Sequence, residues 1–213
     1  MFRQSTNTAA FFSVLFAALI FLLSLAGVAA AQGNTSFGTG ALQNNTTGSF
    51  NTAVGLNALL SNTTGSLNTA NGVNALLNNT TGVLNTASGA QALVSNTIGN
   101  QNTASGANAL FSNTTGTANT ASGFSALGNN TTGVNNTANG SSVLASNSTA
   151  NGNTAIGESA LHQNTTGNFN TASGNAALLF NTTGSANVAH GRQCASEQHY
   201  RQRQHRHRSH CVQ

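Results

Sequence analysis

A unit of seventeen residues repeats nine times in this chain, and it constrains the fold more than any other feature of the sequence. The copies run from Asn34 to Ala186 without an insertion or a deletion, and residues 51–67 form a representative copy. The consensus is N-T-A-x-G-x-x-A-L-x-x-N-T-T-G-x-x. A strict short period of this kind predicts a stack of similar units in which each copy contacts only its neighbours.

The invariant positions of the unit indicate how each copy is built. Positions 1 and 12 are always asparagine, position 5 is always glycine, position 9 is always leucine, and position 15 is glycine in all copies but one. Glycine suits a corner that needs positive φ or a close backbone approach, leucine fills the interior, and stacked asparagines can form a hydrogen-bonded ladder. In two of the copies the predicted ladder and corner residues are Asn51, Gly55, Leu59, Asn62, Gly65, Asn102, Gly106, Leu110, Asn113 and Gly116.

This pattern favours an all-β solenoid over a helical array or a disordered chain. Two glycines in each unit and apolar residues without 3.6-residue spacing exclude a helix. A composition rich in Gly, Asn, Ser and Thr is typical of disorder, but a disordered segment has no reason to keep three residue types in register over nine copies. We therefore predict a parallel β-roll or β-helix with two short strands in each coil and about 4.8 Å between coils.

Apolar residues at two variable positions predict self-association. If they face outward, they form a stripe of the kind that marks an interaction surface, and the expected assembly is a homotrimer. The stripe would contain Leu60, Leu77, Val94, Phe111 and Leu179 at position 10, with Phe50, Leu67, Leu84 and Phe169 at position 17.

The units "NTAVGLNALLSNTTG", "NTASGANALFSNTTG" and "NTAIGESALHQNTTG" resemble the head repeats of trimeric autotransporter adhesins, the haemagglutinin/invasin-type repeats of bacterial surfaces. Similar arrays occur in phage-tail-like fibre proteins. The resemblance covers residues 34–186 and is strongest in the N-T-A-[VI]-G cores at 51–55 and 153–157. It implies a left-handed, trimeric parallel β-roll that is displayed outside the cell and binds host or matrix surface molecules.

The chain also departs from that family. Its unit is longer than the best-known head unit, and neither a heptad stalk nor a C-terminal set of membrane strands is recognisable, so we expect it to correspond to a head alone. Polar residues replace the core aliphatic residue of the family motif at Asn71, Ser88, Ser105, Ser122, Asn139 and Ser173.

Residues 1–31 have the features of a secretory signal peptide. Arg3 supplies a positive charge, residues 11–25 are almost continuously apolar, and small residues precede Gln32. The apolar run is also long enough to act as an uncleaved membrane anchor. Either interpretation predicts a body that is secreted or exposed at the cell surface, and no membrane contact is expected for the mature body.

The composition argues against an enzyme, a cofactor site and a metal site. Glu158 is the only charged side chain between Asn34 and Ala186, so the pair that it could form with His162 is interpreted as surface variation. Calcium-binding β-roll repeats need aspartate at fixed places, and the body contains none. Asn-x-Thr tripeptides match the glycosylation motif, but we interpret them as ladder positions; they include Asn45, Asn62, Asn79 and Asn113.

The basic segment "QHYRQRQHRHR" at residues 198–208 has no counterpart in the body. Its histidines and the nearby Cys194 and Cys211 lack the paired spacing of a zinc site, and its few arginines would allow only salt-dependent phosphate contacts. A frameshift between Gly191 and Cys194 fits better. With suitable codons, residues 198–208 read one nucleotide later as N-T-T-G-N-G-N-T-A-T-G, the repeat in phase. The net charge of +4 then has no function, and no nucleic-acid partner is expected.

Two functions are compatible with this sequence. The first is a non-enzymatic adhesin-like head that binds by many weak contacts multiplied by avidity. The alternative is an ice-binding or other fibre-type structural solenoid, because the threonines at positions 2, 13 and 14 would form regular rows. Against ice binding, these threonines are expected beside the Asn and Gly turns, without a flat T-x-T pairing on one strand.

Overall fold

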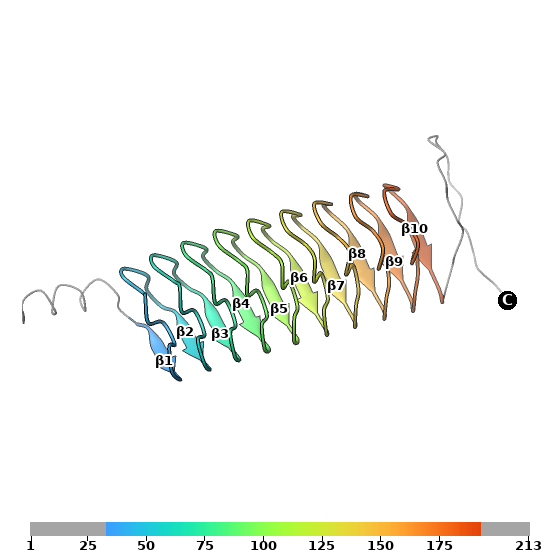
Figure 1. Cartoon of the computed structure of the whole chain (residues 1–213). Helices are drawn as coiled ribbons and strands as arrows, with labels where there is room; N and C mark the ends of the chain where they lie inside the picture. Colours follow the sequence, from blue (N-terminus) through green and yellow to red (C-terminus); the bar gives the residue numbers. More distant parts are fainter. Residues whose placement is uncertain (1–32, 193–213) are drawn as a thin grey trace, which may run out of the picture.

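The computed structural model describes residues 33–192 of the chain. The predicted signal peptide and the predicted frameshifted tail beyond Gly191 lie outside the described residues, apart from Arg192. The described part is an all-β parallel solenoid of about nine coils with about 17 residues in each turn, which confirms the predicted fold class. Figure 1 shows the coils in a single row, each beside the next.

Ten strands of three residues each form one parallel sheet along one side of this row (Figure 1). Each strand pairs with the strand one repeat further along, so Thr86 lies opposite Thr103 and Ala87 opposite Ala104. The strands are β1 (Thr35–Phe37), β2 (Thr52–Val54), β3 (Thr69–Asn71), β4 (Thr86–Ser88), β5 (Thr103–Ser105), β6 (Thr120–Ser122), β7 (Thr137–Asn139), β8 (Thr154–Ile156), β9 (Thr171–Ser173) and β10 (Val188–His190).

The prediction of two strands in each coil is wrong, because each coil of the described residues contains one. The remainder of the coil consists of turns, and its backbone still pairs with the coils on either side. The Leu76 N–H donates to the carbonyl of Ala92 in the following coil at 3.0 Å, and the Gly89 N–H donates to the carbonyl of Asn71 in the preceding coil at 2.9 Å. Because coil-to-coil hydrogen bonds also form outside the strands, strands of only three residues are enough to keep the coils stacked.

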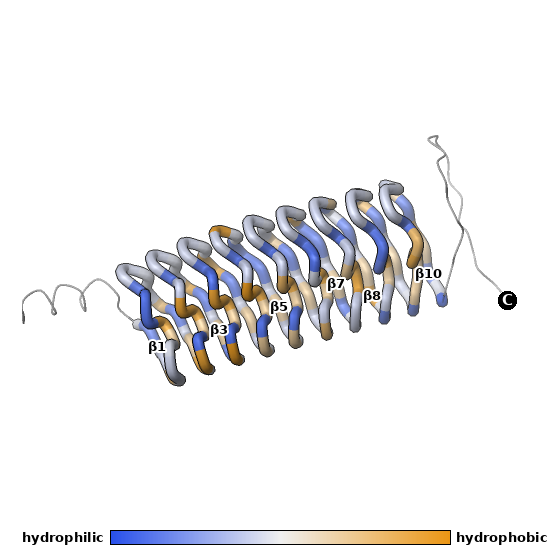
Figure 2. Tube along the Cα trace, in the orientation of Figure 1, coloured by the Kyte–Doolittle hydropathy of each residue, from blue (hydrophilic) through white to orange (hydrophobic). Residues whose placement is uncertain are grey.

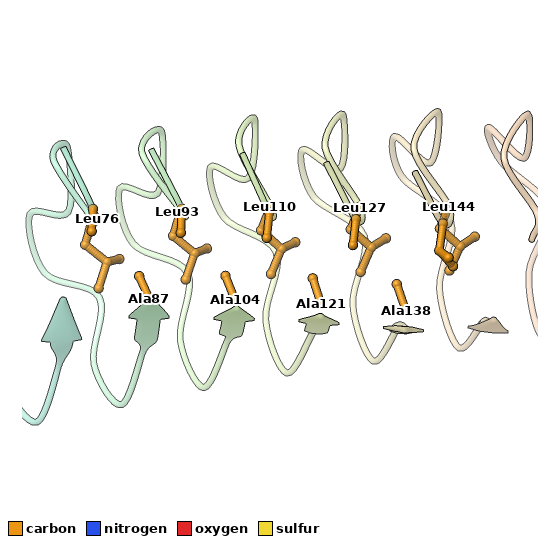
Figure 3. Packing of buried hydrophobic residues seen from close by; sticks show 14 of the residues in the cluster. Leu76, Ala87, Leu93, Ala104, Leu110, Ala121, Leu127, Ala138 and Leu144 are labelled. Atoms are coloured by element: carbon orange, nitrogen blue, oxygen red, sulfur yellow. The ribbon is translucent and has the colours of Figure 1, made fainter. Parts of the chain in front are cut away.

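The interior of each coil is narrow and filled by small apolar side chains. The alanine at position 3 points inward from the strand, and the alanine and leucine at positions 8 and 9 reach it from the opposite side (Figure 3). Leu76, Leu93 and Leu110 are fully buried and form one row, as predicted for position 9. Because the rows follow the repeat, the core is continuous from coil to coil.

Left-handed backbone at non-glycine residues is the least expected feature of the coil. Leucine at position 9 has φ between 50° and 53° in all nine copies, and residues at positions 7 and 17 also have positive φ, such as Asn57 (56°) and Leu67 (60°). Left-handed conformations of non-glycine residues cost about 1–3 kcal/mol each and persist only where the surroundings enforce them. Here the enforcement comes from burial of the leucine and from pairing with both neighbouring coils.

The two glycine positions have different physical roles. At position 5 the predicted corner is present: Gly106 has φ +134°, and a Cβ there would lie 2.5 Å from the carbonyl oxygen of Gly123 in the next coil. Position 15 lacks the positive φ of such a corner. A Cβ on Gly116 would instead lie 2.3 Å from Oδ1 of Asn113 and 2.6 Å from the carbonyl oxygen of Gly133, so the second glycine provides room for an asparagine ladder.

Candidate functional site

The asparagines at position 1 form a continuous buried ladder. Asn102 donates from Nδ2 to the carbonyl of Gly116 at 2.8 Å, and its backbone N–H donates to Oδ1 of Asn85 at 3.0 Å. Its own Oδ1 accepts from the backbone N–H of Asn119 at 3.0 Å. Asn102 and the neighbouring ladder residues Asn85 and Asn119 are fully buried. Each side chain therefore closes its own coil and joins it to the coils before and after.

A second ladder runs through position 12. Asn113 donates from Nδ2 to Oδ1 of Asn96 at 2.8 Å and to the carbonyl of Gly116 at 3.1 Å, and its Oδ1 accepts from Nδ2 of Asn130 at 2.9 Å. The Gly116 carbonyl thus accepts from both ladders within one coil. Among the described residues no buried side-chain nitrogen or oxygen lacks a partner, which is the condition for buried amides to stabilise a fold.

The structure places the asparagines of the Asn-x-Thr tripeptides in this second ladder, as interpreted from the sequence. Asn62, Asn79 and Asn113 are fully buried, and Asn45 in the first coil is half-buried. Their amide nitrogens donate to carbonyl oxygens of position 15, for example from Asn62 to Gly65 at 2.9 Å. An acceptor nitrogen in this arrangement is closed to modification once the coil has folded.

The predicted ladder residues of the two representative copies lie in these places. Asn51 and Asn62 are buried beside the Gly65 carbonyl, to which they donate at 2.8 and 2.9 Å. Leu59 and Leu110 are fully buried. Gly55, like Gly106, has positive φ (133°) and faces the backbone of the next coil. These residues lie within the coils and build the rod, so its outer surface is formed by the other positions of the unit.

The outward side chains of the strands form a regular exposed surface, which we call the strand face. It consists of positions 2 and 4, because position 3 points into the core. In β3 to β7 position 4 holds only asparagine or serine, as at Asn71 and Ser105. Position 2 is threonine in nine consecutive strands: Thr35, Thr52, Thr69, Thr86, Thr103, Thr120, Thr137, Thr154 and Thr171.

The threonines of the strand face differ from those of position 13 in their hydrogen bonding. At position 13 the hydroxyl group donates to the backbone of the next coil, as from Thr97 to the Thr114 carbonyl at 3.1 Å. Within the described residues, the position 2 hydroxyl groups of β2 to β9 have no protein partner. The position 2 threonines lie on the three-residue strands, each directly after the asparagine of position 1. As expected, no described strand carries a T-x-T pair, because position 4 is never threonine.

Large apolar side chains are exposed along the whole row of coils, from Phe37 to Val188. Figure 2 shows the most hydrophobic stretches of the chain in the coils around β1 to β5. At position 17 the predicted outward orientation is present: Phe50, Leu67 and Leu84 are exposed by 63%, 53% and 48%. Position 10 differs in part, because Val94 is buried and Leu60, Leu77 and Leu179 are half-buried, whereas Phe111 is exposed. Position 6 was not predicted and adds Leu56, Val73 and Phe124 to the exposed apolar residues.

Glu158 and His162 do not form a pair through hydrogen bonds. The Glu158 carboxylate accepts from Nδ2 of Asn175 at 3.3 Å, and Nδ1 of His162 lies 2.9 Å from the Ser142 carbonyl oxygen. Residues 33–192 contain no group of three His, Cys, Asp or Glu side chains that could hold a metal ion. None of the helices that a membrane crossing would require occurs in this part of the chain.

The chain matches no protein-family model, no curated protein and no solved structure. The resemblance to adhesin head repeats therefore depends on the repeat motif itself. What the structure adds to that resemblance is the solenoid with 17-residue turns and the asparagine ladders.

Sequence reasoning missed the strand face and the left-handed positions. The alternation of Thr, Ala and a small polar residue before position 5 was a usable signal for the strand face, because alternate residues of a strand point to opposite sides. Asparagine at position 7 in Asn57, Asn74 and Asn108 was a signal for left-handed backbone. Leucine at position 9 carried no such signal.

Proposed function

We propose that the chain is a non-enzymatic rod that is exported and mediates attachment outside the cell through many weak, repeated contacts. The observation that carries this proposal is the register of the solenoid, in which every strand residue lies opposite its counterpart one repeat away. A weak contact made by one coil is then available again at each following coil. Repetition of weak contacts on a rigid body raises the overall affinity without any new contact type.

The surface chemistry supports this function. The body is almost uncharged, with Glu158 the only charged side chain between Asn34 and Ala186, and the asparagine ladders and the leucine row are used to build the coils. The signal-like residues 1–31 agree with export to the cell surface or medium. The resemblance to adhesin heads points to host or matrix molecules as the target and to a left-handed trimer as the working form.

When whole coils are deleted, attachment is expected to fall by a larger fraction than the number of coils. Deletion of residues 85–135 removes three of the nine units and joins Leu84 to Asn136 in the correct register. Beads bearing this variant should be retained on a surface coated with extracellular matrix by less than two thirds of the full-chain level, because avidity multiplies contacts. Retention that scales with coil number, or no retention of the full chain, would contradict the proposal.

A register-breaking deletion provides the control. Removing residues 85–93 deletes only part of a unit, so asparagines and glycines of adjacent coils no longer meet. This smaller deletion should lower the β-sheet circular dichroism signal per residue and destabilise the rod, whereas the deletion of three whole units should keep the same spectrum per residue.

The exposed position 17 stripe is proposed as the trimer contact. The double variant Leu67→Asn, Leu84→Asn should shift the mass measured by light scattering from trimer to monomer. Both residues have left-handed backbone (φ 60° and 59°), which asparagine tolerates well, and Asn135 already occupies this position. Thr81→Asn at an exposed site is the control. A monomeric unmodified chain at every concentration would refute the trimer.

A further inference from the structure

The strand face has an order that the proposed attachment function does not require. Ten strands lie in one sheet with equivalent residues in register, and the outward side chains of β3 to β7 are threonine, serine and asparagine alone. Two rows of polar groups thus run along the rod. Neighbours within a row are about 4.8 Å apart, and the rows are separated by two residues of extended chain, about 6.6 Å.

Threonine at position 2 is suited to a rigid partner. Its hydroxyl group can donate and accept, its methyl group is apolar, and its β-branched side chain is restricted at χ1. From β2 to β9 these hydroxyl groups are not engaged by the protein within the described residues. The row is therefore ordered before binding, and little side-chain entropy is lost when it meets a surface.

The size of the strand face argues against a globular protein as its partner. Three residues of strand span about 10 Å, and ten strands span about 43 Å, so the face offers about 430 Å². A stable protein interface buries about 800 Å² on each partner. A narrow surface with a row of threonines in strict register instead matches a partner that is itself periodic.

The chemistry of the face also restricts the partner. From β3 to β7 it has no charged group, so it complements an uncharged surface. The same strands carry no aromatic side chain that could stack on the rings of a crystalline polysaccharide. The partner class that these two exclusions leave is a hydrogen-bonded lattice of small molecules. Ice is such a lattice, and its water oxygens repeat in two perpendicular directions at distances close to the two spacings of the strand face.

We propose that the strand face binds ice, with the position 2 threonines as the principal contact residues. The hydroxyl groups join the water lattice, and the methyl groups fill the gaps between lattice rows. This function does not depend on the attachment proposal or on the trimer, since it uses only the exposed face of the sheet.

The test is freezing-point hysteresis of the full chain, together with the shape of single ice crystals under a microscope. The unmodified chain should depress the freezing point below the melting point and produce faceted crystals. Thr120→Tyr should reduce hysteresis at least about fivefold at equal concentration, because one bulky ring holds the adjacent threonines off a flat surface. Tyrosine is a good strand former, so the sheet is expected to persist.

Thr132→Tyr is the matched control. Thr132 is also exposed, at position 14, where Ile98 shows that a large side chain is accepted. This variant should keep the full hysteresis. Thr120→Val is a second variant of the strand face that replaces the hydroxyl group with a methyl group of similar size, and Val188 occupies the same place in β10. Circular dichroism establishes folding of all three variants.

Three outcomes would overturn the proposal. The first is a folded full chain without hysteresis or crystal faceting. The second is equal loss in the Thr120→Tyr and Thr132→Tyr variants, which would show that the strand face has no special role. The third is cosedimentation with insoluble cellulose or chitin that Thr120→Tyr abolishes, without an effect on ice, which would assign the face to carbohydrate.

Discussion

Replacing Asn113 by leucine is expected to lower the free energy of unfolding by about 3 kcal/mol, because leucine has nearly the same shape but no amide group. The substitution removes the donor to Oδ1 of Asn96 and the acceptor used by Nδ2 of Asn130. Buried polar groups left without a partner cost about 1–3 kcal/mol each. Urea unfolding followed by far-ultraviolet circular dichroism measures the change.

Asn129 provides the control for this prediction. It lies one residue before the ladder position of its coil and is exposed. Asn129→Leu should therefore change the free energy of unfolding by no more than about 0.5 kcal/mol, as is usual for surface substitutions. If the two leucine variants unfold at the same urea concentration, the ladders do not stabilise the coil.

Replacing Gly106 by alanine is expected to be at least as damaging. A Cβ at this position would lie 2.5 Å from the oxygen and 2.7 Å from the carbon of the Gly123 carbonyl, and both atoms belong to backbone that cannot move alone. The φ of +134° adds strain for any side chain. We expect a loss of about 3 kcal/mol or more, from backbone strain of about 1–3 kcal/mol and the steric overlap.

Gly128→Ala is the matched substitution in the next coil. Gly128 lacks positive φ, and its nearest Cβ contact would be the Ser125 carbonyl oxygen at 3.2 Å. Other coils hold larger residues at this position, such as Leu60 and Leu77. The substitution should leave stability unchanged or raise it by up to about 1 kcal/mol, because alanine restricts the unfolded chain. Similar losses in both variants would exclude a special role for position 5.

The parts of the fold that sequence could predict are those in which residue type and structural role correspond one to one. Asparagine at positions 1 and 12 has few reasons to recur except a ladder, and leucine at position 9 fills the core as expected. The period of seventeen residues by itself predicts the stacking register, in which Thr86 lies opposite Thr103. These predictions succeeded because the residue preference at each position, which is weak in one unit, is seen again in all nine copies.

The number of strands and the path of the turns could not be predicted in the same way. Three-residue strands carry little local signal, and most of the coil is held by backbone bonds to neighbouring coils, which any residue can make. Left-handed backbone at Leu110 contradicts the local preference of leucine and arises only from its surroundings. The strand face differs, because the Thr-Ala alternation does signal it, but the nearby Asn and Gly residues make the position 2 threonines resemble turn residues.

The direction of the coil-to-coil hydrogen bonds has a mechanical consequence. These bonds run along the long axis of the rod, so a pull on its two ends loads the coils in series and the weakest outer contact gives way first. Each detached coil of 17 residues would release about 60 Å of extended chain. A tethered rod of this kind would lengthen under tension in regular increments and dissipate the force coil by coil.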